Sequence, residues 1–217
     1  STNQPTQLIE LYTSEGCSSC PPADRWINKL KQHRRLWSEF IPVVFHVDYW
    51  DYIGWKDPFA QAFFTKRQRQ YSQQNNLSSI YTPGMILNGQ EWTSWRRFSN
   101  LNSLPAKAAG TLSIDLNKQA TSAHYQPLDD HSSKLILNIA ILGFDLKVEV
   151  KNGENGGRVL EHDFVVLGYQ QRVMSVASDD SYISSSTPLP SLSSNADTTA
   201  LVAWVSTEKN LSPLQTT

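Results

Sequence analysis

The chain has two cysteines, Cys17 and Cys20, and only Ser18 and Ser19 separate them. They follow an apolar run at residues 8–12 and precede a segment with helical periodicity. The N-terminus of a helix carries unpaired N–H groups and a partial positive charge, which favour a thiolate over a thiol. Cys17 is placed to act as the nucleophile, and Cys20, one turn further, can attack a mixed disulfide at Cys17. The spacing therefore predicts thiol–disulfide exchange.

Two other uses of the cysteine pair stay open. A closed zinc site usually takes four ligands, and no spacing of cysteine and histidine in this chain fits a common zinc module. A copper or zinc carrier that uses Cys17, Cys20 and His46 is thus a weaker alternative, and we assign no metal ligand. A purely structural disulfide would constrain the unfolded chain little, because its loop is very short. Redox use needs no cofactor, since the dithiol itself holds the electrons.

Strand and helix patterns alternate around the cysteines. Residues 7–13 contain β formers in alternation, and Pro21 and Pro22 suit the first turn of a following helix. Residues 23–32 continue that helix with one apolar face. Residues 41–47 form an apolar run of strand length, as in a parallel strand buried on both faces. The cysteines thus fall at the carboxyl end of the first strand, where open α/β sheets place their sites.

Residues 48–57 gather four aromatic and three acidic side chains. This segment follows the second predicted strand, and it forms either an aromatic wall beside the cysteines or a compact loop packed on its own side chains. Asp57 can cap a helix predicted over residues 58–74. Residues 85–87 should form a strand, and Asn88-Gly89 is a strong hairpin turn signal before a return strand at 90–93. A short helix between residues 95 and 109 would follow.

The predicted order up to residue 110 is β-α-β-α-β-β-α, the order of the thioredoxin core. Within that order Thr82-Pro83 takes the position of a cis-proline loop that faces the cysteine pair, so we expect a cis peptide bond there. Pro83 would then join Cys17 and Cys20 in the catalytic set. The expected substrate groove adds four residues, which are Thr82, Trp50, Trp55 and Asp48.

The pattern changes after residue 110. Seven short strand patterns appear, separated by turn signals such as Asn152-Gly153, and helical periodicity is almost absent. Residues 178–199 are rich in serine and are predicted to form a long surface loop. We therefore expect an α/β thioredoxin-like domain over residues 1–110, followed by an all-β, sandwich-like domain over residues 111–217. No triad or metal-ligand spacing marks the second half, which we interpret as a scaffold or partner-binding module.

Three motifs carry a resemblance to a known family. They are the Cys-Ser-Ser-Cys-Pro-Pro-Ala-Asp sequence at 17–24, His-Val-Asp-Tyr-Trp-Asp at 46–51 with Gly-Trp-Lys-Asp-Pro-Phe at 54–59, and Tyr-Thr-Pro at 81–83. The chain resembles a bacterial family of secreted, thioredoxin-like proteins of unknown function. This resemblance implies a thioredoxin-like fold and export but supplies no substrate. Unlike ordinary thioredoxins, the chain has Ser-Ser between its cysteines and Gly16 before them, so the direction of electron transfer stays open.

Charge and composition limit the kinds of binding partner and the cellular compartment that we expect. Lysine and arginine total 19 and aspartate and glutamate total 20, so the net charge is −1 and no basic patch favours nucleic acid. No apolar run approaches the length of about 20 residues that spans a bilayer. The polar start at Ser1 suggests a processed N-terminus, and the composition suits a periplasmic or secreted protein.

Two further side chains have open roles at this stage. We interpret His46 as a strand residue with a satisfied ring, and a catalytic or ligand role is the alternative. Glu10 on the first strand is either an edge-facing charge, which we favour, or a buried carboxylate that relays protons to Cys20.

The leading hypothesis is an exported thiol–disulfide oxidoreductase-like protein that acts on a protein or small-molecule thiol or disulfide. The alternative is a non-enzymatic binding module on a thioredoxin-like scaffold, with residues 48–55 as an aromatic recognition loop. The sequence identifies no client, electron donor or oligomeric state.

Overall fold

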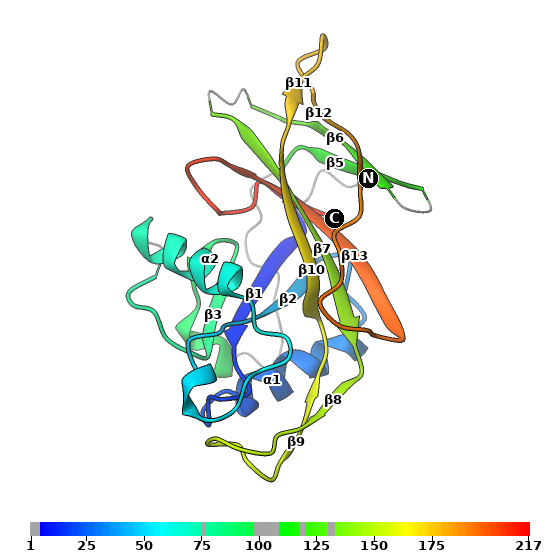
Figure 1. Cartoon of the computed structure of the whole chain (residues 1–217). Helices are drawn as coiled ribbons and strands as arrows, with labels where there is room; N and C mark the ends of the chain where they lie inside the picture. Colours follow the sequence, from blue (N-terminus) through cyan, green and yellow to red (C-terminus); the bar gives the residue numbers. More distant parts are fainter. Residues whose placement is uncertain (1–4, 75–76, 98–108, 118–119, 130–132) are drawn as a thin grey trace.

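The computed structural model describes residues 5–74, 77–97, 109–117, 120–129 and 133–217. Eight strands form its main sheet: β1 (Gln7–Thr13), β2 (Phe40–His46), β3 (Gly84–Leu87), β4 (Gln90–Glu91), β7 (Leu135–Phe144), β10 (Val165–Val173), β13 (Thr198–Thr207) and β14 (Gln215–Thr216). Their order across the sheet is β14-β13-β7-β10-β2-β1-β3-β4. Strands from both halves of the chain therefore lie side by side in one mixed sheet (Figure 1).

The junction between the halves lies at β2. This strand pairs in parallel with β1 along its whole length, and its other edge meets β10 in parallel at Val44 and Val165. Every residue of β2 is buried, as its apolar sequence predicts. The predicted fold class is wrong, because no separate β domain follows a thioredoxin-like one. The described residues contain fourteen strands but only two α-helices, and the large sheet is shared by both halves.

Helices cover the sheet near its β1 and β2 strands. Helix α1 (Pro21–Asn28) begins with the two prolines and continues as the short 3-10 helix η1 (Lys29–Gln32). Helix α2 (Ala62–Gln73) starts later than predicted, because Gln61 is extended and the carboxylate of Asp57 instead accepts the N–H of Phe59. Two further 3-10 helices are η2 (Asp51–Ile53) and η3 (Thr93–Arg97), and residues 98–108 of the helix predicted at 95–109 lie outside the described residues.

A smaller sheet and a hairpin complete the fold. The small sheet contains β5 (Thr111–Asn117), β6 (Ala120–Gln126), β11 (Ser175–Val176) and β12 (Tyr182–Pro188), in the order β11-β12-β6-β5. Its buried residues share a core with β7 and β13, so the β-rich half is sandwich-like. The prediction of a long loop at 178–199 is wrong at β12, which pairs with β6 despite its serines. The hairpin of β8 (Leu146–Glu149) and β9 (Val159–His162) lies beside α1 at the opposite end (Figure 1).

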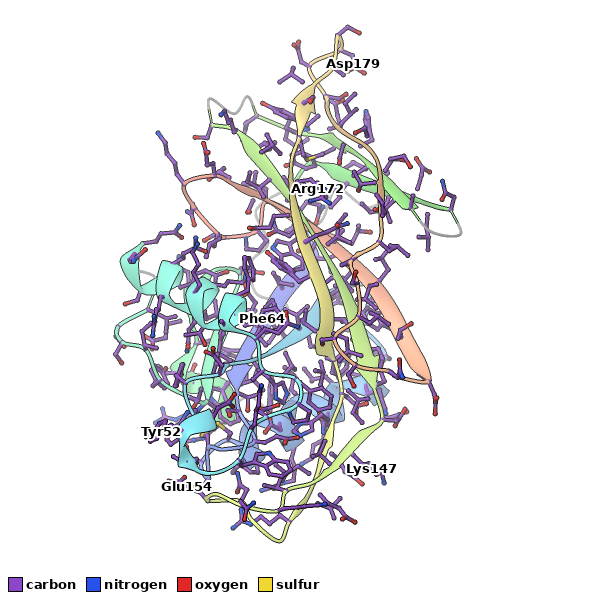
Figure 2. All side chains as sticks on the ribbon, in the orientation of Figure 1. Tyr52, Phe64, Lys147, Glu154, Arg172 and Asp179 are labelled. Atoms are coloured by element: carbon purple, nitrogen blue, oxygen red, sulfur yellow. A yellow bond between two sulfur atoms is a disulfide. The ribbon has the colours of Figure 1, made fainter. Side chains whose placement is uncertain are left out.

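A buried ion pair lies in the main core. Arg67 of α2 donates to both carboxylate oxygens of Glu10 at 3.2 Å, and Tyr12 and Tyr71 donate their hydroxyls to the same carboxylate. The guanidinium also lies over the rings of four aromatic residues, Phe45, Tyr71, Tyr169 and Trp204. The prediction that Glu10 is an edge-facing charge is therefore wrong, because the residue is fully buried. Its carboxylate is hydrogen-bonded within the core and helps to hold α2 against the sheet. Phe64 of α2 belongs to the same core (Figure 2).

Candidate functional site

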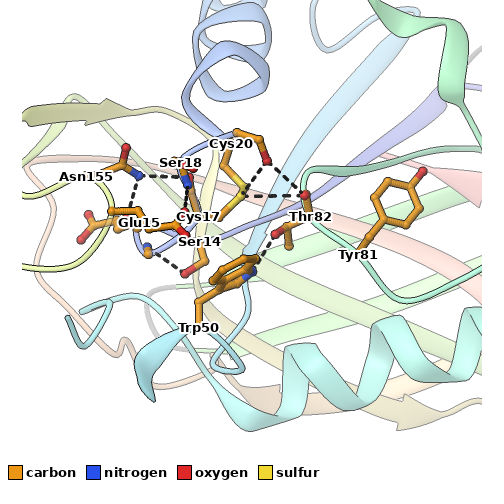
Figure 3. Close-up of a disulfide and its surroundings, with 12 residues drawn as sticks. Ser14, Glu15, Cys17, Ser18, Cys20, Trp50, Tyr81, Thr82 and Asn155 are labelled. Carbon is orange, nitrogen blue, oxygen red and sulfur yellow. Dashed lines mark hydrogen bonds between the residues drawn. A yellow bond between two sulfur atoms is a disulfide. The ribbon is translucent and has the colours of Figure 1, made fainter. Parts of the chain in front are cut away.

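The cysteine pair closes a disulfide between the end of β1 and the start of α1 (Figure 3). Cys20 is the residue that caps α1, and the two Cα atoms are 5.4 Å apart. The cysteines are 1% and 0% exposed, whereas Ser18 and Ser19 between them are exposed. The polypeptide therefore reaches solvent at the two serines, and the sulfur atoms lie just beneath them.

The Thr82-Pro83 peptide bond lies directly beside this disulfide. It is cis, which confirms the expectation for this bond. The sulfur of Cys17 lies 3.8 Å from the carbonyl oxygen of Thr82, and Ser19 donates its hydroxyl to the same carbonyl at 3.5 Å. Residues separated by more than sixty positions thus meet at the cysteines, while the role of Pro83 in catalysis stays a prediction.

The aromatic segment supports the cysteine loop through indole N–H groups. Trp50 donates to the hydroxyl of Thr82 at 2.8 Å, and Trp55 donates to the carboxylate of Glu15 at 2.7 Å. Tyr52 is 82% exposed and points outward (Figure 2). The carboxylate of Asp48 accepts the hydroxyl of Thr65 on α2, and its place in a substrate groove stays a prediction.

Gly16 explains how the two loops approach so closely. A Cβ atom at this position would lie 2.9 Å from the Cβ of Trp50, nearer than side-chain carbons pack. The glycine that precedes Cys17 therefore makes room for the aromatic segment.

The loop between β8 and β9 holds the cysteine loop from the other side. Asn155 is buried and donates to the carbonyls of Glu15 at 2.8 Å and Cys17 at 3.0 Å (Figure 3). The N–H of Ser18 donates to the carboxylate of Glu154 at 3.0 Å, and hydrogen bonds from the side chain and the N–H of Ser18 lower the pKa of that carboxyl. In the sequence, residues 152–157 carry only turn signals, which give no indication of this contribution.

Buried carboxylates and imidazoles lie behind the cysteine loop. The ring of His46 bonds the carboxylate of Asp57 through Nδ1 at 2.7 Å, and His162 bonds Glu15 through Nε2 at 3.2 Å. Asp57 also accepts the N–H of Glu15 at 2.9 Å, so the two pairs are joined. The centres of the two imidazole rings are 5.0 Å apart. His46 is therefore only half satisfied, since its Nε2 has no hydrogen-bond partner.

The pKa shifts of His46 and Asp57 both favour the charged form of the side chain. Burial acts to lower the pKa of His46, but the neighbouring carboxylate of Asp57 outweighs it and raises that pKa. Burial acts to raise the pKa of Asp57, while the charge and hydrogen bond of His46 lower it overall. The pair is thus a buried ion pair over the pH range between the two shifted values.

Asp24 is a further buried carboxylate that sequence analysis missed as a site residue. It lies on α1 four residues after Cys20, and its Oδ1 has no hydrogen-bond partner. Burial raises the pKa of this carboxyl against the opposing effects of His162 and His46. The pattern of residues 23–32 places this acid opposite the apolar face formed by Trp26, Ile27 and Leu30, so the sequence gives no signal of its burial. Among the described residues, no group of three histidine, cysteine or acidic side chains is arranged to hold a metal ion.

The chain belongs to the family described as a protein of unknown function, DUF1223, which matches residues 8–206. That match confirms the resemblance to an uncharacterised family and includes strands from both halves. A comparison with curated proteins gives no match. Neither α-helix in the described ranges has the length and apolar character required to cross a bilayer.

Two solved structures are similar in fold. HBP35 of Porphyromonas gingivalis is 16% identical with a TM-score of 0.63, and the alignment covers 99% of this chain and 74% of that one. A protein from Agrobacterium tumefaciens is 20% identical with a TM-score of 0.52, and the alignment covers 91% of this chain and all of the other. At these identities the similarity concerns the fold alone.

Proposed function

We propose that this protein exchanges disulfides with thiol-bearing partners through Cys17 and Cys20. The observation that carries the proposal is the disulfide at the N-terminus of α1, beside the carbonyl of Thr82. Such a helix end stabilises a thiolate, and we propose that the adjacent Thr82-Pro83 loop shapes the substrate groove. The relation to thioredoxin-type redox sites is proposed for these loops only, not for the whole fold.

The roles follow from the order of the two cysteines. Cys17 precedes the helix and is attacked by the partner thiolate, whereas Cys20 caps the helix and leaves. A partner dithiol thereby becomes a disulfide, and the protein becomes a dithiol. We also propose that the protein works in the periplasm or outside the cell, since disulfides persist in oxidising compartments.

A fluorescent peptide with two thiols tests the proposal. The oxidised protein should convert the peptide to its disulfide with one equivalent of protein consumed for each disulfide formed. The Cys20→Ser variant should instead accumulate a mixed disulfide through Cys17 after exchange with a disulfide form of the peptide. The Cys17→Ser variant is the matched control and should form no such adduct.

The binding-module alternative makes a different prediction. Trp50 and Trp55 hold the site with their indole N–H groups, so truncating them would also disturb the cysteine loop. Tyr52 is the exposed aromatic residue of the segment, and Tyr52→Ala tests recognition without that disturbance. Absence of peptide oxidation, together with partner binding that depends on Tyr52 and survives Cys17→Ser, would contradict the redox proposal.

A further inference from the structure

Three buried titratable side chains behind the cysteine loop each have an unpartnered polar atom. They are Asp24 on α1, His46 on β2 and His162 on β9, which are 5%, 0% and 3% exposed. The unpartnered atoms are Oδ1 of Asp24, Nε2 of His46 and Nδ1 of His162. Buried polar atoms are nearly always hydrogen-bonded, so these atoms are placed to form hydrogen bonds with water or with a neighbouring group. We call these three residues the Asp24 cluster.

The Asp24 cluster adjoins Cys20 through helix geometry. The N–H of Asp24 donates to the carbonyl of Cys20 at 3.2 Å, which is the helical spacing of four residues. Side chains at this spacing lie on one face with Cβ atoms about 5–6 Å apart, and the later one leans toward the helix N-terminus. Both residues are buried, so this shared face is the inner face of α1. The carboxyl of Asp24 thus lies on the Cys20 side of the cluster.

A cavity connects the same cluster to the surface. It has a volume of about 310 Å³ and lies between α1 and β9. Asp24 and His162 line its wall, together with the charged side chains of Arg25, Lys29 and Glu161. Asp57 and Glu15 also face the cluster, since their carboxylates form hydrogen bonds with His46 and His162 respectively. Solvent can therefore approach Asp24 and His162 through the space between α1 and β9.

We propose that the Asp24 cluster is an acid–base site that exchanges a proton with Cys20 during thiol–disulfide exchange. This inference rests on the proposed function. Cys20 is fully buried, so its thiolate needs a proton source inside the protein. Asp24 follows Cys20 by one helical turn on the buried face of α1, and the cavity that it lines gives a route for replenishment from water.

The step is balanced as follows. The thiolate of a partner dithiol attacks the sulfur of Cys17, the bond between the two cysteine sulfurs breaks, and Cys20 leaves with the electron pair. The Asp24 cluster delivers one proton to the Cys20 thiolate and regains one from water through the cavity. The second thiol of the partner then loses its proton to water and displaces Cys17 as a thiolate, so the partner is oxidised and the protein is reduced.

Burial raises the pKa of Asp24, so its carboxyl retains a proton at higher pH than an exposed aspartate does. His46 also holds its proton to higher pH, because Asp57 lies against its ring. The two imidazoles stabilise the carboxylate that remains once Asp24 has given its proton away.

Reduction of the oxidised protein by dithiothreitol tests the inference without a biological partner. The ratio of the variant rate to the wild-type rate is measured at each pH from 5.5 to 8.5, so the ionisation of the reagent cancels. Asp24→Asn should slow reduction at least about tenfold at the acidic end, since it can bond but cannot donate an acidic proton. His162→Gln retains a donor for Glu15 and should give a smaller loss and a shifted pH profile.

The matched control is Asp145→Asn, which removes a largely exposed carboxylate that pairs with Lys31. It should reduce at the wild-type rate at every pH. Equal rates for wild type and Asp24→Asn would overturn the inference. A wild-type protein that fails to oxidise the dithiol peptide would instead overturn the proposed function, so the two failures are distinguishable.

A measurement on the unchanged protein covers the case in which Asp24→Asn does not fold. The carboxyl carbon of Asp24 is followed by NMR as a function of pH in the oxidised and the reduced protein. Proton exchange with Cys20 requires the titration midpoint to differ between the two forms, because the leaving thiolate competes for the same proton. The same midpoint in both forms would also overturn the inference.

Discussion

At the scale of single residues, burial and partner decide what each charged side chain does. Glu10 and Asp24 are both buried carboxylates, yet Glu10 is saturated by Arg67 and two tyrosines, and Asp24 keeps a free oxygen. A sequence pattern can place an acid on a strand or a helix face, but its partner depends on which distant element packs there. For this reason sequence analysis left the role of Glu10 open and treated Asp24 only as part of a motif.

The ion pair between Glu10 and Arg67 predicts a large stability effect. Arg67→Met should lower the free energy of unfolding by about 3–5 kcal/mol, because it leaves a buried carboxylate without its counter-charge. Urea unfolding monitored by circular dichroism measures the loss. Arg35→Met, which breaks the partly exposed pair with Glu39, is the control and should cost no more than about 1 kcal/mol. Similar losses in the two variants would contradict a core role for Glu10.

The pair of His46 and Asp57 predicts how stability depends on pH. The pKa of His46 is raised on folding. Its contribution to folding stability is therefore full below pH of about 6.5, its unfolded pKa, and is lost as the pH rises through the higher folded pKa. The pKa of Asp57 is lowered, so its contribution is full above about 3.9 and is lost as pH falls through the folded value. The urea concentration at the midpoint of unfolding should therefore fall as the pH of the wild-type protein is raised from 6 to 9. A His46→Gln variant should show a flatter profile, and an equally steep decline would contradict the assignment.

At the scale of elements, local patterns predicted most of what surrounds the cysteines. The strands at β1, β2 and β3, the prolines at the start of α1 and the Asn88-Gly89 turn follow from apolar runs and turn chemistry. The Cys17 and Thr82 loops could be predicted together because both belong to short motifs. Asn155 and His162 could not, since their contacts with the cysteine loop span more than a hundred residues.

The contact between the cysteine loop and the aromatic segment predicts the effect of Gly16→Ala. The added methyl group meets Trp50, so one of the two loops must shift. We expect a loss of about 1–3 kcal/mol in unfolding free energy and a red shift of tryptophan emission as Trp50 loses its bond to Thr82. Ser18→Ala, at an exposed neighbouring position, is the control and should change neither quantity. An unshifted spectrum in Gly16→Ala would contradict the close approach.

At the scale of the whole molecule, the division predicted near residue 110 does not separate two sheets. The change in sequence pattern there is real, because the strands become dense after it. The pairing of β10 with β2 is a long-range parallel contact, and nothing in either local pattern specifies it. The sequence pattern therefore predicted where helical segments give way to strands. It did not predict that strands of the second half complete the sheet of the first half.

The shared sheet predicts cooperative unfolding of both halves. Calorimetry of the oxidised protein should show a single transition, because loss of β7, β10, β13 and β14 exposes the edge of β2 and removes half of the main sheet. A fragment that ends at residue 110 should show no cooperative transition under the same conditions. Two resolved transitions, or a stably folded fragment, would contradict this account of the fold.

The hydrogen bonds from Asn155 to the cysteine loop also have a consequence for biosynthesis. Ribosomes release the N-terminus first, so Cys17 and Cys20 emerge well before the loop that holds their carbonyls. The two thiols are close in sequence and can be oxidised on the nascent chain, without waiting for the fold. Their environment, by contrast, is completed only when the β8–β9 hairpin and β10 have been made. A chain stalled midway would therefore carry the reactive pair before the residues that control it.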